Sequence, residues 1–239
     1  MNHVVITGGN KGLGLAQTAL FLEKGAHVHV VARSRGDLDT LPQEKLSFVQ
    51  ADLSNWRDTS WLDAIHKTAG KIDGIVNNAG AHLKKPVWDV TGDELEAVLD
   101  INVKAMFTAC GRYVDLQKDH GGAIVNISSM GGIMALQSAA AYVTSKTAVI
   151  GLTRSIAVDA APFGFRSNAV CPGFIDTDMT RAVLAKDPAR REKIEGRIPS
   201  HRFGTPENIA KAVHFLISDE ATYINGVALP VDDGYSIGF

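Results

Sequence analysis

The chain has 239 residues, of which 45% are hydrophobic and 21% charged, and its formal net charge is −2. This composition is typical of a soluble globular protein. The near-neutral charge, without a basic block or an acidic tail, argues against nucleic acid and anionic membranes as partners. Cys110 and Cys171 lie far apart in apolar stretches and lack metal-ligand spacing. We therefore expect reduced core cysteines, no bound metal and a cytoplasmic location.

No stretch of the sequence predicts a secretory signal or a membrane span. The first residues lead straight into a strand pattern, without a basic start or a long apolar region. Residues 121–145 carry no charge, but Asn126, Ser128, Ser129 and Gln137 interrupt their apolar character. A buried strand followed by a loop is the interpretation that this pattern favours.

The first motif is a glycine-rich turn between a strand and a helix. Residues 3–7 form a β-branched run typical of a buried parallel strand, and residues 15–24 carry a helical pattern. The turn between them contains Gly8, Gly12 and Gly14. Glycines let a pyrophosphate approach the backbone, and a helix start supplies free N–H groups, so the motif indicates dinucleotide binding. A tight turn without a ligand is the alternative.

The residues after the second predicted strand, 26–32, bear on the choice of cofactor. In dinucleotide-binding folds an acidic residue here binds the ribose 2′-hydroxyl, whereas an arginine accommodates a 2′-phosphate. This chain has Arg33 and Ser34 at the position, no carboxylate until Asp37, and Lys11 in the nearby turn. These cations favour NADP over NAD, unless they are only solvated loop charges.

Strand and helix patterns alternate along the rest of the chain. We predict further strands at residues 46–51, 73–78, 122–128, 165–171 and 223–231, and helices at residues 55–69, 94–117, 139–161 and 206–218, the last with Thr205 as its cap. The alternation predicts an α/β protein with a Rossmann-like doubly wound parallel sheet of about seven strands. Helices would cover both faces in a three-layer α/β/α arrangement, with a single domain over residues 1–239. The segment 36–45 has room for only one helical turn.

Three features have a role that the residues alone leave open. Asn77-Asn-Ala-Gly80 ends the fourth strand with small residues, which either leave room for a flat ligand or form a plain turn. Asn102 lies inside an apolar helical pattern, where it could bond backbone groups, kink the helix or hold a water. Residues 177–202 are irregular and charged, which suits a substrate lid as well as a solvated helical hairpin.

Tyr142 and Lys146 are the strongest candidates for chemistry. Residues four apart lie on one face of a helix, so the two side chains project together if residues 139–161 are helical. An ammonium beside a phenol stabilises its anion, so we expect the pKa of Tyr142 to fall below the usual value of about 10. Such a phenol could exchange a proton near neutral pH. Taken alone, such a pair is more often an ordinary surface pair.

In sequence order these motifs resemble the short-chain dehydrogenases/reductases. The resemblance covers essentially the whole chain and rests on Thr7-Gly8-x-x-x-Gly12-x-Gly14, Asn77-Asn-Ala-Gly80, Asn102, Ser129, Tyr142-x-x-x-Lys146 and Pro172-Gly173. It implies an NAD(P)-dependent oxidoreductase that interconverts a ketone and a secondary alcohol by hydride transfer. Hydride transfer places negative charge on the substrate oxygen, so hydrogen-bond donors must converge there.

The resemblance also implies roles for single residues. Tyr142 would be the general acid or base, and Lys146 would lower its pKa and hold the nicotinamide ribose. Ser129 would bond the substrate oxygen, and Asn102 would hold a water that relays protons. Ser128 is not chosen, because strand alternation points it to the opposite face. The cofactor would contact Gly8, Asn10, Lys11, Gly12 and Leu13 with its pyrophosphate and adenosine phosphate, Arg33 and Ser34 with its 2′-phosphate, Asp52 and Leu53 with its adenine, Asn78 and Ala79 with its adenosine side, and Ile175 and Thr177 with its carboxamide.

Partners and substrates follow from the resemblance in outline. It implies a homotetramer and a small carbonyl or alcohol substrate, either a 3-oxoacyl thioester or a small polar keto compound such as a keto-sugar acid. His82, Lys84 and Lys85 could meet an acidic substrate, although a solvated loop is the commoner reason for such residues. Asp233 stands where the family commonly has a glycine, which could change a subunit contact or a local turn.

Two rival functions are considered. A catalytically silent, dinucleotide-sensing regulatory protein of the same fold would be expected to lack a member of the active set. Asn102, Ser129, Tyr142 and Lys146 are all present. An epimerase or dehydratase acting on nucleotide sugars would be expected in a longer chain with a larger C-terminal substrate region.

Overall fold

The fold is built on one sheet in which every neighbouring pair of strands is parallel. The computed structural model describes residues 1–177, 180–181, 184–185 and 187–238. Its seven strands stand in the order β3-β2-β1-β4-β5-β6-β7. Their bounds are β1 His3–Thr7, β2 His27–Ala32, β3 Leu46–Gln50, β4 Gly74–Asn77, β5 Gly122–Ile127, β6 Phe165–Pro172 and β7 Ala228–Val231. The winding direction reverses between β1 and β4, the kind of switch point where open α/β sheets bind ligands.

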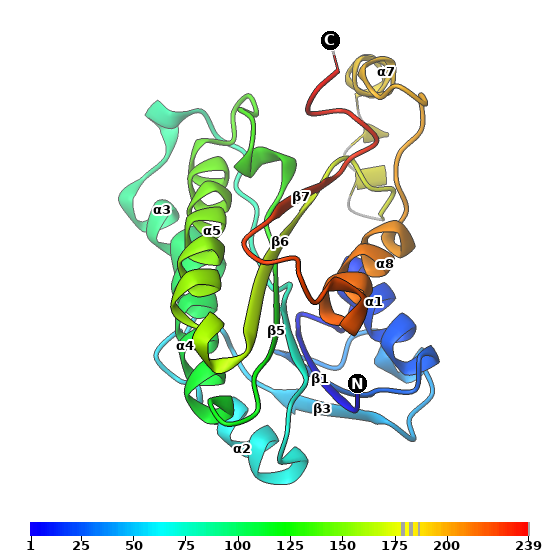
Figure 1. Cartoon of the computed structure of the whole chain (residues 1–239). Helices are drawn as coiled ribbons and strands as arrows, with labels where there is room; N and C mark the ends of the chain where they lie inside the picture. The colour runs from blue at the N-terminus through cyan, green and yellow to red at the C-terminus, as the bar shows by residue number, and fades with distance from the viewer. Residues whose placement is uncertain (178–179, 182–183, 186, 239) are drawn as a thin grey trace.

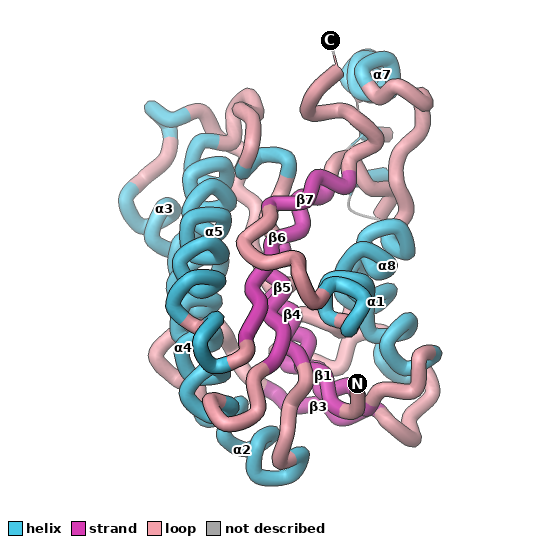
Figure 2. Tube along the Cα trace, viewed as in Figure 1, coloured by secondary structure: helices cyan, strands magenta, loops and turns pink. Residues whose placement is uncertain are grey.

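Helices cover both faces of the sheet, as Figures 1 and 2 show. Their bounds are α1 Gly12–Glu23, α2 Ser60–Ala69, α3 Gly92–Leu99, α4 Ala105–Gln117, α5 Ala140–Asp159, α7 Pro188–Arg197 and α8 Pro206–Ile217. One core lies between the sheet and α1 with α8, and the other lies between the sheet and α2, α4 and α5. The prediction of a Rossmann-like three-layer α/β/α fold is confirmed.

The residues of β1 show why the strand patterns read as continuous apolar runs. Val4 and Ile6 lie in the core under α1 and α8, whereas Val5 lies in the core under α2 and α4. All three side chains are fully buried. Successive strand residues point to opposite faces, so a strand with helices on both sides must be apolar at every position.

Residues 92–117 are helical without a gap, close to the predicted 94–117, but the helix is not α-helical throughout. α3 ends at Leu99, a π-helical segment spans Asp100–Lys104, and only then does α4 begin. The predicted helix start is close to the observed one, because Thr91 and Glu94 form a capping box in front of α3. Asn102 lies at the centre of the π-helical segment, the kind of local widening that is frequent at functional sites.

Other differences concern the ends of elements. α1 begins at Gly12 instead of residue 15, α2 begins at Ser60 instead of residue 55, and β7 is confined to Ala228–Val231. The segment 36–45 contains one 3-10 turn, Leu38–Thr40, as its length predicts. α8 begins after Thr205, whose N–H donates to Asn208 Oδ1 at 2.8 Å.

Asp233 adopts a backbone conformation that glycine favours. Its φ is +52°, in the left-handed region where glycine is favoured. Its carboxylate accepts a hydrogen bond from the hydroxyl of Ser200. Of the two effects expected at this position, the structure shows a local turn held by a hydrogen bond.

Cys110 and Cys171 are both free and buried. Burial raises the pKa of Cys110 to about 12, which keeps it a neutral thiol. The described ranges contain no group of three or more His, Cys, Asp or Glu side chains arranged to hold a metal ion. Nor is any helix in those ranges both long enough and apolar enough to cross a membrane.

Candidate active site

The glycine-rich turn joins the carboxyl end of β1 to the first turn of α1. Gly8 and Gly12 have φ of +64° and +53°, in the region that favours glycine. A Cβ on Gly14 would lie 2.1 Å from the carbonyl oxygen of Gly8, so only glycine lets the helix approach the turn this closely. α1 has no side-chain cap and no acidic residue in its first turn. Its free N–H groups and positive dipole end are therefore available to an anion.

Two asparagines tie this turn to its neighbours. Asn10 is 7% exposed, and its side-chain amide donates to the carbonyl oxygen of Ser34 at 3.0 Å. The side-chain amide of Asn78 donates to the carbonyl oxygens of Thr7 and Gly8 at 3.2 and 3.1 Å. Both side chains, predicted as cofactor contacts, are thus bonded to the backbone that shapes the turn.

The predicted 2′-phosphate site lies beside the turn. Lys11, Arg33 and Ser34 are all exposed. The pKa of the Asp52 carboxyl is lowered, mainly by hydrogen bonds from Ser54, with a smaller contribution from the nearby charge of Arg33. Arg33 and Lys11 thus present positive charge to solvent next to the start of α1.

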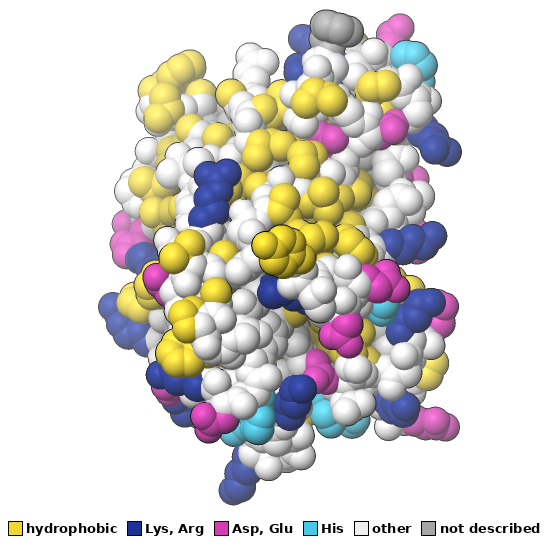
Figure 3. Space-filling model, viewed as in Figure 1, with side chains coloured by type: hydrophobic (Ala, Val, Ile, Leu, Met, Phe, Trp, Pro, Cys, Tyr) yellow, Lys and Arg dark blue, Asp and Glu magenta, His cyan; other side chains and the backbone are white. Residues whose placement is uncertain are grey.

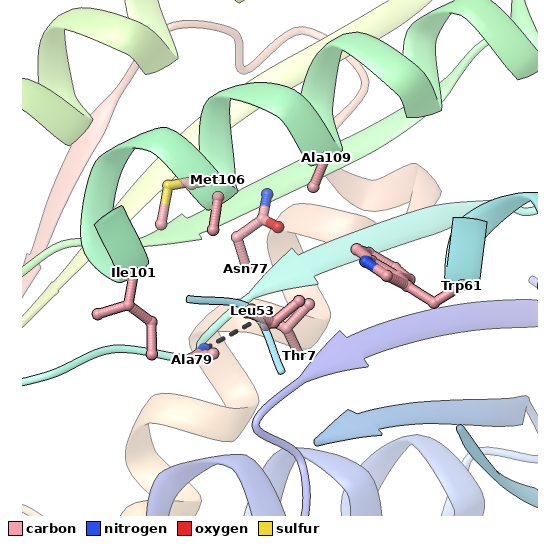
Figure 4. A pocket seen from close by; sticks show the side chains of 9 residues that line it. Thr7, Leu53, Trp61, Asn77, Ala79, Ile101, Met106 and Ala109 are labelled. Carbon is pink, nitrogen blue, oxygen red and sulfur yellow. Dashed lines mark hydrogen bonds between the residues drawn. The ribbon is translucent and has the colours of Figure 1, made fainter. Parts of the chain in front are cut away.

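One predicted adenine contact, Leu53, and one predicted contact of the adenosine side, Ala79, meet at a small cavity, shown in Figure 4. Leu53 and Ala79 line it, together with Asn77 and Met106. Ala79 N–H donates to Thr7 Oγ1 at 3.1 Å, which holds the loop after β4 against β1. The cavity volume of about 10 Å³ has room for roughly one water. Leu53 and Ala79 therefore lie together, but an adenine ring would have to lie outside this cavity.

The four predicted catalytic residues come from three segments beyond the carboxyl ends of the strands. Ser129 follows β5, Tyr142 and Lys146 lie in the first two turns of α5, and Asn102 lies in the π-helical segment. Lys146 is 4% exposed, and its Nζ lies 5.7 Å from the centre of the Tyr142 ring. The Ser129 side chain lies beside the Tyr142 hydroxyl, where it acts on the pKa of the phenol.

Asn102 acts through its side chain on the loop after β4. The residue is fully buried. Its Oδ1 accepts from Ala81 N–H at 2.7 Å, and its Nδ2 donates to the Ala81 carbonyl oxygen and to Ser145 Oγ, both at 2.9 Å. Of the three possibilities left open, backbone bonding is the one that its side chain adopts. The proton-relay water stays a prediction.

Ser128 and Ser129 have separate surroundings. Ser128 Oγ donates to the carbonyl oxygen of Lys146 at 2.7 Å, which ties α5 to the end of β5. Ser129 Oγ accepts from Gly131 N–H at 3.0 Å and lies beside Tyr142. Ser129 is therefore the serine near the phenol.

The expected direction of the Tyr142 pKa shift is wrong. Burial raises the pKa of Tyr142, and the neighbouring Ser129 side chain opposes that rise only in part. Burial also lowers the pKa of Lys146 to about 8, because a low dielectric disfavours the charged form. The Lys146 ammonium donates to the carbonyl oxygen of Ile127 at 2.8 Å. Desolvation therefore outweighs the attraction on which the expectation rested, and the phenol is protonated at neutral pH.

Gly80 belongs to this site, although the sequence analysis assigned it no role. A Cβ at this position would lie 3.0 Å from Asn102 Oδ1 and 3.5 Å from Lys146 Nζ. The glycine thus lets the loop after β4 pass close to both side chains. The signal in the sequence was a glycine at the end of the Asn-rich motif, but nothing there names the side chains that it accommodates.

The predicted carboxamide contacts follow β6. Ile175 is 6% exposed and forms an isolated parallel bridge with Gly204. Thr177 Oγ1 shares a hydrogen bond with Thr180 Oγ1 at 3.0 Å. These contacts hold the chain where the predicted lid begins.

The predicted lid, residues 177–202, includes α7. Ile194 of α7, and Ile198 directly after the helix, join an apolar cluster with Met130 and Tyr235. Met130 directly follows Ser129, so α7 packs against the loop that carries this serine. Residues 178–179, 182–183 and 186 of the predicted lid lie outside the described residues.

These residues fit a dinucleotide. A Cβ would fill the cradle at Gly14, the start of α1 is free of a side-chain cap, and Arg33 offers an exposed cation beside it. Such an arrangement suits a pyrophosphate and a further phosphate. Tyr142 lies beyond the carboxyl ends of the strands, on the side where open α/β sheets bind ligands.

Comparison with known families and curated proteins gives matches along the whole chain. The family model described as enoyl-(acyl carrier protein) reductase matches residues 8–236. Cyclopentanol dehydrogenase of Comamonas sp. (strain NCIMB 9872) is 36% identical over 243 residues, which cover 98% of this chain and 96% of that protein. The 3-oxoacyl-(acyl-carrier-protein) reductase FabG of Thermotoga maritima is 36% identical over 241 residues, covering 98% and 97%.

Solved structures are similar over the same extent. The crystal structure of levodione reductase has a TM-score of 0.92 and 33% identity, and the match covers 100% of this chain and 98% of that one. ElxO with NADP bound has a TM-score of 0.90, 31% identity and 98% coverage of both chains. 4-Hydroxyisoleucine dehydrogenase complexed with NADH has a TM-score of 0.89, 31% identity and 100% coverage of both. The last two hold different cofactors, so the likeness leaves the choice between NADP and NAD open.

Proposed function

We propose that this chain prefers NADP(H) and uses Tyr142 as its general acid and base. The chain belongs to the short-chain dehydrogenases/reductases and is thus an oxidoreductase acting on ketones and secondary alcohols. The observation that carries the proposal is the convergence of Tyr142 with Ser129 and Lys146. Residues 1–239 would act as one cofactor-binding and catalytic domain, with residues 177–202 as the substrate lid.

The side chains divide the work of carbonyl reduction between them. The bound nicotinamide supplies the hydride. As the substrate oxygen gains negative charge, the hydroxyls of Ser129 and Tyr142 donate hydrogen bonds to it. Tyr142, whose raised pKa keeps it protonated until that charge develops, gives its proton to the oxygen. The Lys146 ammonium, 5.7 Å from the ring, stabilises the phenolate that is left. Alcohol oxidation runs through the same groups in reverse.

Substitution of Tyr142 tests this mechanism. The wild type is expected to oxidise NADPH with at least one member of a panel of ketones, keto-sugar acids and acetoacetyl thioesters. Tyr142→Phe removes the transferred proton and is expected to lower kcat by about 10³-fold. Its affinity for NADPH, measured by fluorescence titration, should stay within a few-fold. Tyr223→Phe, at a fully exposed tyrosine, is the matched control. Retained turnover in Tyr142→Phe contradicts the mechanism, and a wild type inactive on the whole panel contradicts the proposed function.

The preference for NADP(H) is supported by Arg33, Ser34 and Lys11, all exposed next to the start of α1. Arg33→Ala should lower the ratio of kcat/KM for NADPH to that for NADH by at least about tenfold, because a guanidinium suits a phosphate dianion. Arg35→Ala is the control, since Arg35 already pairs with Asp39 at 2.8 Å. An unchanged ratio in Arg33→Ala would show that Arg33 is only a loop charge.

Oligomeric state and location are part of the proposal. A homotetramer is supported by exposed apolar side chains at Val158 of α5 and Phe107 of α4. Figure 3 shows further hydrophobic side chains gathered over β7, which is an edge strand of the sheet. Light scattering would measure the state directly. The two free, buried cysteines suit a reducing compartment such as the cytoplasm.

The substrate would be either a 3-oxoacyl thioester or a small polar keto compound such as a keto-sugar acid. Relatives named as acting on cyclopentanol and on 3-oxoacyl carrier-protein thioesters are equally identical to this chain, at 36%. Overall likeness therefore favours neither class. The choice depends on the side chains around Tyr142.

A further inference from the structure

His82 lies against the general acid of the site. It follows the loop after β4, and its ring centre is 4.5 Å from that of Tyr142, with the ring planes at 52°. The residue before it, Ala81, is held at both its N–H and its carbonyl oxygen by the Asn102 side chain. His82 itself is exposed, but its ring contact with Tyr142 and the anchored Ala81 place it at the solvent edge of the proposed substrate oxygen site.

In the described part of the chain, the charges that act on His82 are positive. Its pKa is lowered by burial first and then by the charges of Arg190, Lys84 and Lys146. Arg190 belongs to α7, Lys84 to the loop after β4, and Lys146 to α5. Three separate elements thus bring cations toward one point next to Tyr142.

Nearby carboxylates are engaged elsewhere. Glu94 forms an ion pair with Lys85, which removes Lys85 from the set of free cations. Asp187 caps α7, accepting from the backbone N–H of Arg190 at 3.0 Å. No carboxylate in the described part of the chain acts on the pKa of His82. The positive charge at this point is therefore not neutralised by those residues.

Arg190 differs from its neighbour on the same helix. Arg191 donates to Glu195 at 2.8 Å and packs over the ring of Phe203. Arg190 is partly buried, and none of the described residues forms an ion pair with its guanidinium within 4.0 Å. A partly buried arginine without a carboxylate partner, close to another donor, suits an anionic ligand group.

We propose that His82 and Arg190 bind an anionic group of the substrate, so that the enzyme acts on ketones and secondary alcohols that carry a carboxylate or a similar anion a few bonds from the reacting carbon. This inference rests on the proposed function and deepens it. It selects small acidic keto compounds over neutral ketones. It also gives a role to the hydrogen bonds between the Asn102 side chain and Ala81, because they help to position the neighbouring His82. Lys84 adds long-range attraction from the rim.

Matched substrates test the proposal. A series of oxo acids with the keto group two to five carbons from the carboxylate is compared with the methyl esters, using NADPH and NADH. For at least one member, kcat/KM of the wild type should favour the acid over its ester by at least about tenfold. Arg190→Gln should reduce that ratio by about tenfold, whereas Arg191→Gln should leave it unchanged. Esters that equal or exceed the acids in every pair, or a ratio unaffected by Arg190→Gln, would overturn the proposal.

A binding measurement separates this proposal from the proposed function. The ring C–H signals of His82 are assigned by NMR through their loss in His82→Phe, which keeps a ring against Tyr142. Glutarate should raise the pH midpoint of the His82 titration in the wild type, and the rise should be smaller in Arg190→Gln. Glutaramide, which carries no charge, should leave the midpoint unchanged. If glutarate has no effect, the anion site is wrong even where neutral ketones are reduced. If glutarate binds but no ketone or oxo acid is turned over, the proposed function fails and the anion site stands.

Discussion

In two clusters of titratable side chains burial shifts a pKa, but the two clusters have different roles. On β1 and β2, the rings of His3, His27 and His29 lie with centres 4.7 to 5.3 Å apart. Burial, helped by the two neighbouring histidines, lowers the pKa of His29 to about 4. Beyond β5, burial lowers the pKa of Lys146 to about 8. A shifted pKa alone therefore does not mark an active site.

The partners of each cluster make the difference. The histidines form hydrogen bonds with one another and with a neighbouring strand of the sheet. His3 Nδ1 lies 3.1 Å from His29 Nε2, and His27 Nε2 lies 2.8 Å from Ser47 Oγ. Lys146 instead stands near Tyr142, whose hydroxyl lies beside a second hydroxyl and beyond the strands' carboxyl ends. Under the proposed function, the convergence of hydrogen-bond donors beyond the strands' carboxyl ends, more than burial, separates the catalytic groups from the structural ones.

Substitution of Lys146 should have a larger effect than substitution of a histidine in the other cluster, and the effect should be a loss of activity. Lys146→Met is expected to lower kcat/KM for ketone reduction by at least about 10²-fold, because the phenolate of Tyr142 loses its ammonium. In the wild type, kcat/KM should decline above about pH 8 as Lys146 loses its proton. Steady-state assays from pH 6 to 10 would measure this decline. The decline should be absent in Lys146→Met. If activity survives the substitution, Lys146 is structural like the histidines, and the contrast between the clusters fails.

Removing His29 should change stability and leave activity alone. The folded-state pKa of His29, about 4, lies below the unfolded value of 6.5. Between these values the unfolded chain binds a proton that the folded chain does not, so stability is lost as the pH falls from 6.5 toward 4. The loss amounts to about 3 kcal/mol from this group. In His29→Leu, urea unfolding at a series of pH values should show a shallower acid loss.

His120→Leu provides the matched control for that measurement, because His120 is exposed. It should keep the acid dependence of the wild type. An equal acid loss in wild type and His29→Leu would mean that the histidine stack is not the source, and a large fall in kcat/KM at pH 7 in His29→Leu would link the two clusters.

A smaller effect on kcat/KM is expected from a substitution at Gly80. Such a substitution tests the same site by displacing a side chain next to Gly80 without removing it. In Gly80→Ala the new methyl group meets Asn102 Oδ1 at 3.0 Å, so the Asn102 side chain must move by a few tenths of an ångström, whereas Lys146 Nζ at 3.5 Å is in ordinary contact. We expect kcat/KM to fall about tenfold, since small misplacements at a reacting centre are costly. Gly92→Ala, where a Cβ meets nothing within 4 Å, is the control. Unchanged kcat/KM in Gly80→Ala would show that the position of the Asn102 side chain is not critical.

Much of the fold could be predicted because its signals are local. β1 is a run of β-branched residues, the glycine turn has a fixed spacing, and Tyr142 and Lys146 are separated by one helical turn. The break between α3 and α4 could not be predicted this way. Asn102 fits a helical pattern, and its bonds to Ala81 and Ser145, made inside the π-helical segment, join residues far apart in the sequence.

The sequence by itself determined the strand and helix order and the cofactor turn, because periodicity and spacing are properties of neighbours along the chain. The four candidate catalytic residues came from the family resemblance that these motifs carry in sequence order. The tertiary structure decided the direction of the Tyr142 pKa shift, since desolvation depends on everything packed around the phenol. It also decided that His82 meets Tyr142, because that contact joins residues 60 positions apart.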